Sequence, residues 1–420
     1  MTKKKHYYQD YDSYEDYVRR EHPEDARMLR AKPRRVKRSV YDEDEPQEMY
    51  EEEDDEYIQD AEEEKPARKR GKKKKKGFLR RLLPILIVLA VIIGVPVYLI
   101  ASRFDNIHSV SDPGRFSRSL KSEMSEEAVT SVSMKDYTNI ALFGVDSREE
   151  ELLSGNNRSD IIIILSMHNR TGKCKLLSVY RDTYLDIGGD SFRKANAAYA
   201  FGGPEQAVNM LNRNFDLNIS DFVTIGFGGL ADLIDAVGGV EIDVAEDEIH
   251  GINDYQSTMA QELSRDYRTV DAPGLQTLDG LQAVAYCRIR YTAGDDYRRT
   301  ERQREVLQQT FRNAKRMTPA KLGAITTQVF RQTATSLTVS EALALSSKLL
   351  MLDIVDTAGC PEASLRTSGT VNQESCIIPK SLEDNVRWLH EFLFEESDYR
   401  VSERVKKISA RIDADTAGIG

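Results

Sequence analysis

Acidic and basic side chains stand together at the ends of several apolar runs. Asp146 directly follows one run, and the next run opens on Arg158 and Asp160. A third run ends on Arg181 and Asp182. Guanidinium groups that converge repel one another, so the site needs a strongly anionic ligand. A diphosphate fits, because the planar guanidinium fork binds phosphate oxygens in pairs.

Two later segments carry the same chemistry. Arg288 and Arg290 alternate on a strand-like run, which predicts that both point to one face. Arg299, Arg302 and Gln303 are spaced i, i+3 and i+4 on a predicted helix and should share its face. Each of these groups alone could form an ordinary surface salt bridge, which is common and contributes little. Their joint placement at strand ends favours a ligand site, because open α/β sheets bind ligands there.

Aspartates inside an arginine cluster need a separate explanation. A hard cation between the carboxylates and the phosphates supplies one. Mg²⁺ is usually held in this way, by one or two carboxylates together with substrate phosphates. We therefore expect a Mg²⁺ site, with Mn²⁺ as a possible substitute.

The elements that must position these groups alternate between strands and helices. Strands interleaved with helices predict an α/β fold, a three-layer-like sandwich with a mixed central β-sheet flanked by helices. Strands are predicted at 138–145, 160–167, 173–180, 222–227 and 240–244, and helices at 204–215, 228–237, 279–286, 297–317, 319–331, 340–351 and 382–394.

An uncharged apolar stretch at 82–101 has about the length that a helix needs to cross a bilayer, roughly 20 residues. Lys72 to Lys76 precede it, so the positive-inside rule puts the N-terminus in the cytoplasm. A cleaved signal peptide has a shorter apolar region and a small-residue cleavage site. We expect a single-pass protein of the cell membrane with an extracytoplasmic C-terminal domain.

Composition divides the chain further. Residues 1–81 are mostly charge and tyrosine and predict a disordered cytoplasmic tail. The remainder carries 36 Lys+Arg against 47 Asp+Glu, and this acidic balance argues against nucleic-acid binding. We expect the transmembrane helix at 82–101, a stalk at 102–132, a catalytic domain at 133–317 and, packed on it, a helical extension at 318–420.

The four cysteines show no zinc-binding spacing. Cys360 and Cys376 bracket a polar loop and are either bridged or two unpaired thiols. Cys174 and Cys287 lie in apolar runs and should behave as small core residues.

Apolar residues between the predicted strands and helices offer a slot for a lipid tail. The alternative is ordinary core packing, which such spacing usually reflects. The candidates are Phe222, Ile225, Phe227, Leu230 and Leu233.

Several motifs in one order resemble the LytR–CpsA–Psr family. They are NIALFGVDSR at 139–148, RSD at 158–160, SVYRDT at 178–183, KANAAYA at 194–200, DAVGGV at 235–240, RIR at 288–290 and DYRRTERQ at 296–303. The resemblance implies a membrane-anchored phosphotransferase. Such an enzyme moves a glycopolymer, for example teichoic acid or capsule, from a polyprenyl-pyrophosphate carrier to peptidoglycan as a phosphodiester.

The resemblance also assigns roles. Asp146 and Asp160 match the metal ligands, and the pyrophosphate-binding set is Arg158, Arg181, Arg288, Arg290, Arg299 and Gln303. Arg148, Asp296 and Arg302 are possible additions. Arg181 and Arg290 are expected to be catalytic, and Asp182 is the favoured general base.

Two other functions stay open at this point. One is a membrane-anchored regulator or sensor that binds polyprenyl pyrophosphate without turnover. The other is a pyrophosphatase of the same lipid. Formation of a covalent adduct, release of free sugar phosphate, or binding alone would distinguish the three.

Overall fold

The computed structural model describes residues 107–146, 152–153, 157–290, 295–318, 329–349 and 352–419. All of these belong to the second of two units, residues 74–420. The predicted tail, the predicted transmembrane helix and Arg148 lie outside the described residues. Among the helices that the structure describes, none is long and apolar enough to cross a membrane.

A mixed sheet forms the centre of the described chain, as predicted. Its strand order is β1-β10-β7-β2-β3-β4-β11. Strands β2, β3 and β4 pair antiparallel, whereas β7 runs parallel to β2 and β11 parallel to β4. The bounds are β1 (His108–Ser109), β10 (Thr333–Thr335), β7 (Asp221–Gly226), β2 (Tyr137–Val145), β3 (Ser159–His168), β4 (Lys173–Val179) and β11 (Asp353–Cys360).

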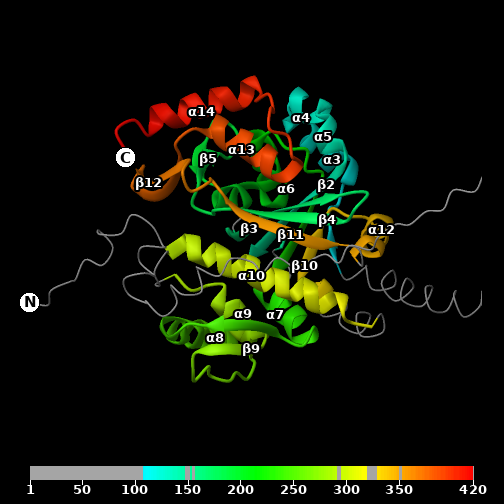
Figure 1. Cartoon of the computed structure of the whole chain (residues 1–420), viewed down its shortest axis with the longest axis vertical. Coiled ribbons are helices and arrows are strands. Elements are labelled where there is room, and N and C mark those ends of the chain that lie inside the picture. Colours follow the sequence, from blue (N-terminus) through cyan, green and yellow to red (C-terminus); the bar gives the residue numbers. More distant parts are fainter. Residues whose placement is uncertain are drawn as a thin grey trace, which may run out of the picture. The chain divides into compact units, whose positions relative to one another are not determined.

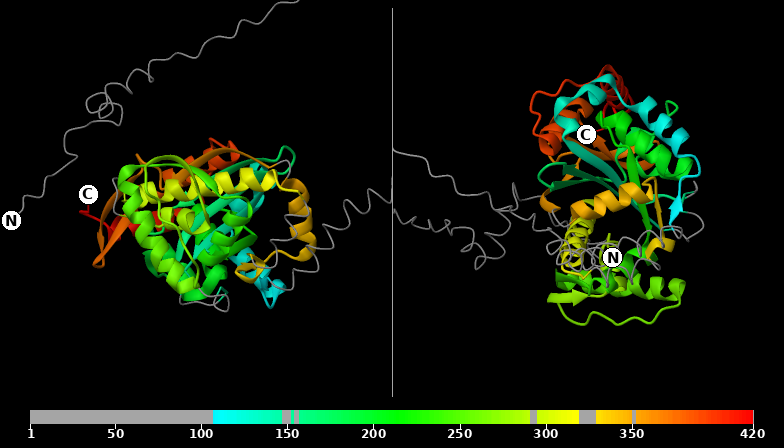
Figure 2. Two further views of the ribbon diagram at one scale, coloured as in Figure 1. Left: turned by 90° about the horizontal axis from the view of Figure 1, so that it is seen from below. Right: turned by 90° about the vertical axis from the view of Figure 1, so that its right-hand side faces the viewer.

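Helices cover both faces of this sheet (Figure 1). On one face, Phe143 and Val145 of β2 pack with α6 (Asn196–Phe215), α13 (Leu382–Phe394) and α14 (Glu403–Asp415). On the other face, Leu142 packs against α10 (Asp295–Lys315). The alternation along β2 reflects the two-residue repeat of a strand. Figure 2 shows the same layers from two further sides.

A second apolar cluster joins α10 to the elements beyond it. Helix α7 (Phe227–Ala236) is followed by Gly238 and Gly239, both at positive φ, as is common after a helix end. The cluster also takes in β8 (Val240–Val244), α8 (Ile249–Leu263), β9 (Gly274–Leu278) and α9 (Gly280–Tyr286), with the short helix η4 (Glu246–Glu248) between β8 and α8.

The prediction of a stalk at 102–132 is wrong for residues 107–132. This segment forms β1, α3 (Pro113–Glu123) and α4 (Glu126–Thr130), with α5 (Val132–Lys135) beginning at its end. Phe116 of α3 is buried, and its ring lies 5.5 Å from that of Phe222. The segment is polar overall, but it buries a narrow apolar stripe that includes Phe116 and Leu120.

The C-terminal region is not the purely helical extension that was predicted. It contributes β10 and β11 to the central sheet and the hairpin β12 (Arg366–Val371)–β13 (Glu374–Pro379), besides α12 (Val339–Leu349), α13 and α14. Helix α13 has the predicted bounds. Cys360 and Cys376 are buried free thiols, so the structure supports the unpaired alternative. Cys174 and Cys287 are buried as predicted.

Candidate functional site

Asp160, at the start of β3, is the hub of the predicted cluster. Its carboxylate lies 2.6 Å from the guanidinium of Arg181, 3.0 Å from that of Arg299 and 3.8 Å from that of Arg290. These arginines come from the loop after β4, from α10 and from the segment after α9. The structure therefore brings residues 139 positions apart in sequence (160 to 299) into direct contact.

Around Asp160, positively charged groups outnumber negatively charged ones. Burial alone would raise the pKa of Asp160, but Arg299, Arg181 and Arg290 outweigh it, and the pKa is lowered. Burial lowers the pKa of Arg299, and the neighbouring Arg181 and Arg290 lower it further against the attraction of Asp160. Guanidinium groups crowd here around too little negative charge, as expected where an anion binds.

Asp182 and Asp296 form a carboxyl pair beside the hub. Asp182 is 7% exposed, and its oxygens lie 3.3 Å from Nζ of Lys194 and 3.4 Å from Nε of Arg181. Burial, then the charge of Asp182 and a side-chain hydrogen bond with it, raise the pKa of Asp296. Asp296 therefore keeps its proton to a higher pH than a free aspartate does.

Asp146 and Arg288 stand at the other edge of the cluster, 3.1 Å apart. The guanidinium of Arg288 lies over the rings of Phe227 (4.9 Å) and Tyr255 (5.4 Å). Arg288 and Arg290 both face the site as predicted, but residues 287–290 form a turn and an irregular segment instead of a strand. The intervening Ile289 is 2% exposed and anchors the segment in the core.

Arg302 does not join the site. Its Nε donates to Glu248 at 2.8 Å, both side chains are almost fully buried, and its Nη1 donates to the carbonyl of Ile289. Arg302 and Gln303 differ by about 100° around the helix and lie on either side of Arg299, so their side chains can reach different partners. Arg302 thus supports the segment that carries Arg288 and Arg290 and does not contact the predicted ligand.

Two segments hydrogen-bond to the backbone of Arg181 and Asp182 and fix it in place. In β13, the N–H of Ile377 donates to the carbonyl of Asp182, and Thr183 bridges to Ile377. At the start of α6, the N–H of Asn196 donates to the carbonyl of Arg181. Sequence reasoning missed the hairpin, and it left Lys194 unassigned although Lys194 lies within one of the quoted motifs.

Gln303 connects the arginine cluster to an apolar cavity of about 180 Å³. Its Nε2 lies 3.5 Å from the carbonyl of Asp160 and 3.4 Å from that of Cys287. The cavity lies between the sheet and α7 and α10, and its wall includes Ile225, Leu230 and Leu233 as predicted. Phe222 faces the opposite side of β7 and packs in the main core, and Phe227 flanks Arg288; neither is among the cavity-lining residues.

The donor set fits Mg²⁺. Asp146 and Asp160 offer hard oxygen atoms at the adjoining ends of the paired strands β2 and β3. Over the described ranges, no three His, Cys, Asp or Glu side chains gather into a metal cage. Mg²⁺ is usually held by one or two carboxylates together with substrate phosphates and water, so Asp146 and Asp160 are the residues that could contribute ligands.

Cations outnumber carboxylates in the whole cluster. Arg158, the one predicted pyrophosphate ligand on a separate wall, is exposed and lines a pocket together with Lys194. The cationic groups that ion-pair in the cluster are Arg181, Lys194, Arg288, Arg290 and Arg299, and the carboxylates are Asp146, Asp160, Asp182 and Asp296.

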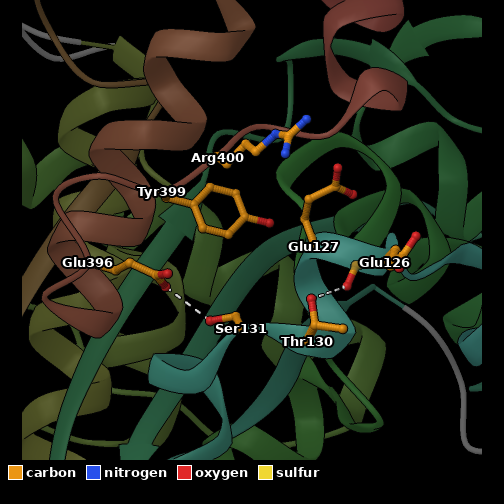
Figure 3. A pocket seen from close by; sticks show the side chains of 7 residues that line it. All are labelled: Glu126, Glu127, Thr130, Ser131, Glu396, Tyr399 and Arg400. Atoms are coloured by element: carbon orange, nitrogen blue, oxygen red, sulfur yellow. Dashed lines mark hydrogen bonds between the residues drawn. The ribbon is translucent and has the colours of Figure 1, made fainter.

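Another large pocket has the opposite charge (Figure 3). Its volume is about 460 Å³, and Glu126, Glu127 and Glu396 line it with a single cation, Arg400. The hydroxyl of Ser131 donates to Glu396 at 3.0 Å. An anionic ligand would be repelled from these walls, so this pocket is not the candidate site.

Comparisons with known proteins agree with the resemblance. The LytR_cpsA_psr family model matches residues 106–378. The chain is 33% identical over 241 residues to the polyisoprenyl-teichoic acid–peptidoglycan teichoic acid transferase TagU of Oceanobacillus iheyensis, covering 55% of this chain and 68% of that protein. It is 38% identical over 187 residues to the probable cell wall biosynthesis protein LcpB of Corynebacterium glutamicum, covering 42% of each.

Solved structures show the same fold. A protein of Enterococcus faecalis described as a transcriptional regulator superposes with a TM-score of 0.52 at 26% identity, covering 69% of this chain and 98% of that one. A Streptococcus agalactiae protein superposes equally well at 26% identity, covering 65% and 92%. The family match begins at 106, where the stalk was predicted, and so includes the helices that replace it. By its motifs, its fold and this match, the chain belongs to the LytR_cpsA_psr family.

Proposed function

We propose that this protein transfers a glycopolymer from a polyprenyl-pyrophosphate carrier to peptidoglycan, which leaves a phosphodiester bond. One observation carries the proposal. Three guanidinium groups surround Asp160, and Gln303 of the same cluster lines an apolar cavity. A ligand that is diphosphate at one end and hydrocarbon at the other matches both halves. The related transferase TagU acts, by its name, on such a lipid-linked polymer.

The reaction needs no external energy source, because the donor's own diphosphate supplies it. A hydroxyl oxygen of the acceptor forms a new bond to the sugar-linked phosphorus, and the bridging P–O bond to the lipid phosphate breaks. The lipid leaves as a monophosphate, and the hydroxyl proton passes to the pair of Asp182 and Asp296. Arg181, Arg290 and Arg299 stabilise the charge that develops on the phosphoryl oxygens.

Asp146 and Asp160 are the residues that would hold Mg²⁺. The ion, when bound, neutralises phosphate charge. The chain's own arginines orient the diphosphate, and Gln303, which lines the apolar cavity, marks its boundary with the polar cluster. We further propose that residues 82–101 anchor the chain in the cell membrane with the described domain outside.

A reconstituted reaction tests the proposal. The full-length chain in detergent is mixed with Mg²⁺, a lipid-pyrophosphate glycopolymer and uncrosslinked peptidoglycan strands. We expect a covalent glycan adduct and lipid monophosphate in equal amounts. Release of free sugar phosphate in place of the adduct would make the protein a pyrophosphatase, and binding without turnover would make it a sensor.

A further inference from the structure

A polar pocket of about 440 Å³ lies beside the cluster on the α6 side. Its walls come from the end of β6 (Phe192–Lys194), the first turns of α6 and the tip of the β12–β13 hairpin. It shares no lining residue with the apolar cavity. The residues that line it are Arg158, Arg193, Lys194, Asn196, Ala197, Ala200, Phe201 and Glu374.

Asn196 is the residue that needs an explanation. It is 1% exposed, and neither its amide nitrogen nor its amide oxygen has a hydrogen-bond partner. Its backbone is fixed, because its N–H donates to the carbonyl of Arg181. A buried amide without partners costs free energy. An unpartnered donor and acceptor on a residue that lines the pocket match an acetamido group or a pair of sugar hydroxyls.

The other walls suit a sugar with negative charge nearby. Phe201 is 64% exposed, an unusual position for a phenyl ring, and Arg193 lies over it at 5.3 Å. An exposed aromatic face packs well against the C–H face of a pyranose ring. Arg158, Arg193 and Lys194 outnumber Glu374, so the pocket attracts carboxylates.

The position of the pocket decides which sugar it holds. Lys194 lines it, and Nζ of Lys194 lies 3.3 Å from Asp182, the proposed proton acceptor. The apolar cavity lies across the sheet, against α7 and α10. Phosphoryl transfer needs the attacking and leaving oxygens roughly in line. With the lipid phosphate leaving toward the cavity, the attacking hydroxyl must arrive from the side of Lys194.

We infer that this pocket seats the acceptor: an acetamido sugar of a glycan strand with a carboxylate close by, its free hydroxyl directed at Asp182. The inference rests on the proposed function and names the acceptor side of that site. Asn196 would bind the acetamido group, Phe201 would stack on the ring, and Arg193 would pair with the carboxylate.

Acceptor kinetics test the inference on the full-length chain. Transfer is measured at varied concentrations of uncrosslinked peptidoglycan strands, and donor hydrolysis by water is measured without them. We expect Phe201→Ala to raise the acceptor KM about tenfold, the scale of one aromatic contact, with the donor KM and the hydrolysis rate unchanged. Phe201→Trp should restore the acceptor KM. Tyr267→Ala, which removes another exposed aromatic ring outside this pocket, is the matched control.

Asn196→Leu is a second variant for the acceptor KM, and it is expected to keep the fold. The amide makes no hydrogen bond in the structure, so Leu should leave the melting temperature unchanged or higher while the acceptor KM rises. A rise in the donor KM with an unchanged acceptor KM would overturn the inference and assign the pocket to the donor's own sugars. Unchanged values of both would also overturn it.

Failure of the proposed function would look different, because the wild-type chain would then form no adduct. Calorimetric titration of wild type and Phe201→Ala with the same glycan strands still decides the inference in that case. Binding by wild type that Phe201→Ala weakens supports the pocket, and equal or absent binding overturns it.

Discussion

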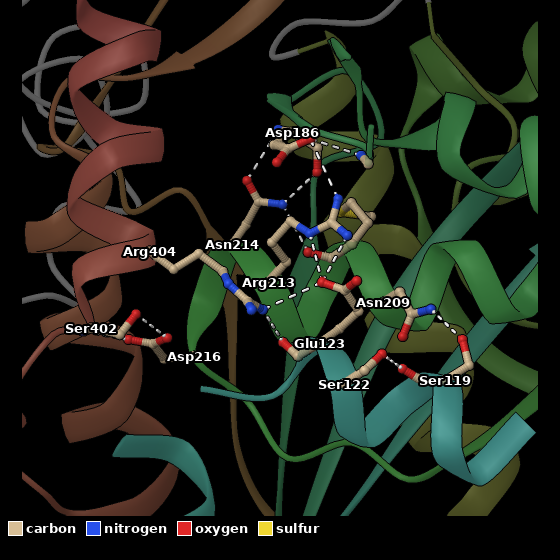
Figure 4. A network of polar contacts seen from close by, with 12 residues as sticks. Ser119, Ser122, Glu123, Asp186, Asn209, Arg213, Asn214, Asp216, Ser402 and Arg404 are labelled. Atoms are coloured by element: carbon tan, nitrogen blue, oxygen red, sulfur yellow. Dashed lines mark hydrogen bonds and ion pairs between the residues drawn. The ribbon is translucent and has the colours of Figure 1, made fainter. Parts of the chain in front are cut away.

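Two clusters of arginines and carboxylates in this molecule have different purposes. In the first, Asp160 meets the guanidinium groups of Arg181, Arg290 and Arg299. In the second, shown in Figure 4, Glu123 accepts from both Arg213 and Arg404, and Arg213 also lies 3.6 Å from Asp186. The second cluster has two cations for two carboxylates and joins α3, α6 and α14.

The difference lies in charge balance around each carboxylate. In the network of Figure 4, the guanidinium groups of Arg213 and Arg404 match the carboxylates of Glu123 and Asp186, and these contacts fasten α3 and α14 to α6. At the hub, burial and then the neighbouring Arg181 and Arg290 lower the pKa of Arg299, against the attraction of Asp160. Arginine–carboxylate contacts alone therefore do not mark a site, whereas an excess of guanidinium groups next to a cavity does.

The largest expected effect is the loss of a hub arginine. Arg290→Ala should lower the transfer rate by a factor of about 10²–10³. Removal of one pre-organised donor that stabilises the transition state commonly lowers the rate by that factor. The side chain of Arg290 is 37% exposed, so the melting temperature should change little. Single-turnover rates together with thermal unfolding check this. A variant that transfers at the wild-type rate would remove Arg290 from the mechanism.

The matched change in the other cluster should have the opposite profile. Arg213→Ala leaves Glu123 and Asp186 without their shared partner, and we expect a loss of about 2 kcal/mol in unfolding free energy. Transfer per folded molecule should stay the same. Denaturant unfolding and active-site titration measure the two quantities. A selective loss of transfer at full stability would instead place Arg213 in the reaction.

A smaller effect is expected in the cavity. Leu233→Trp fills part of the space between α7 and the sheet, and the affinity for a long-chain prenyl pyrophosphate should fall about tenfold, the cost of leaving roughly two methylene groups in water. Affinity for inorganic pyrophosphate should not change. Competition binding with both ligands tests this, and equal weakening of the two would mean that the substitution disturbs the arginines.

The smallest effect concerns the carboxyl pair. The pKa of Asp296 is raised by burial and by Asp182, so its ionised form lowers stability in the folded state. That penalty is absent below the unfolded pKa of about 3.9 and grows as the pH rises through the folded value. Asp296→Asn should therefore raise the melting temperature at neutral pH and give no gain near about pH 3. An increase in melting temperature that is the same at every pH would mean that ionisation of Asp296 does not cause it.

Much of the sheet and most of the site could be predicted from the sequence. The buried strands β2, β3 and β4 are continuous apolar runs, and the residues at their ends meet as expected. Arg302 was assigned wrongly because helical spacing indicates which residues are neighbours on the helix but not which group each side chain binds. Arg302 binds Glu248, 54 positions away in sequence. Alternation along β7 determines the face of the sheet on which Phe222 lies. Apolar residues occur on both faces of this run, so the sequence pattern did not indicate which face that is.

The long-range pairings could not be predicted. Strand β10 is only Thr333–Thr335 and finds its place by pairing with β7, 108 positions earlier (Thr333 with Ile225). No local pattern in three residues specifies such a partner. The α3 helix was missed for a related reason, because its two buried residues, Phe116 and Leu120, are few among charged neighbours.

The strand order has a practical consequence for anyone shortening this chain. The last recognisable motif ends at Gln303 and its helix α10 at Lys315, yet β11 and β10, which follow in the chain, cover the outer sides of β4 and β7. A polypeptide cut at that point would keep every arginine of the hub and present two long, bare strand edges to its neighbours. Such edges recruit other chains, so we expect that fragment to precipitate, and a useful soluble version must run on through α14.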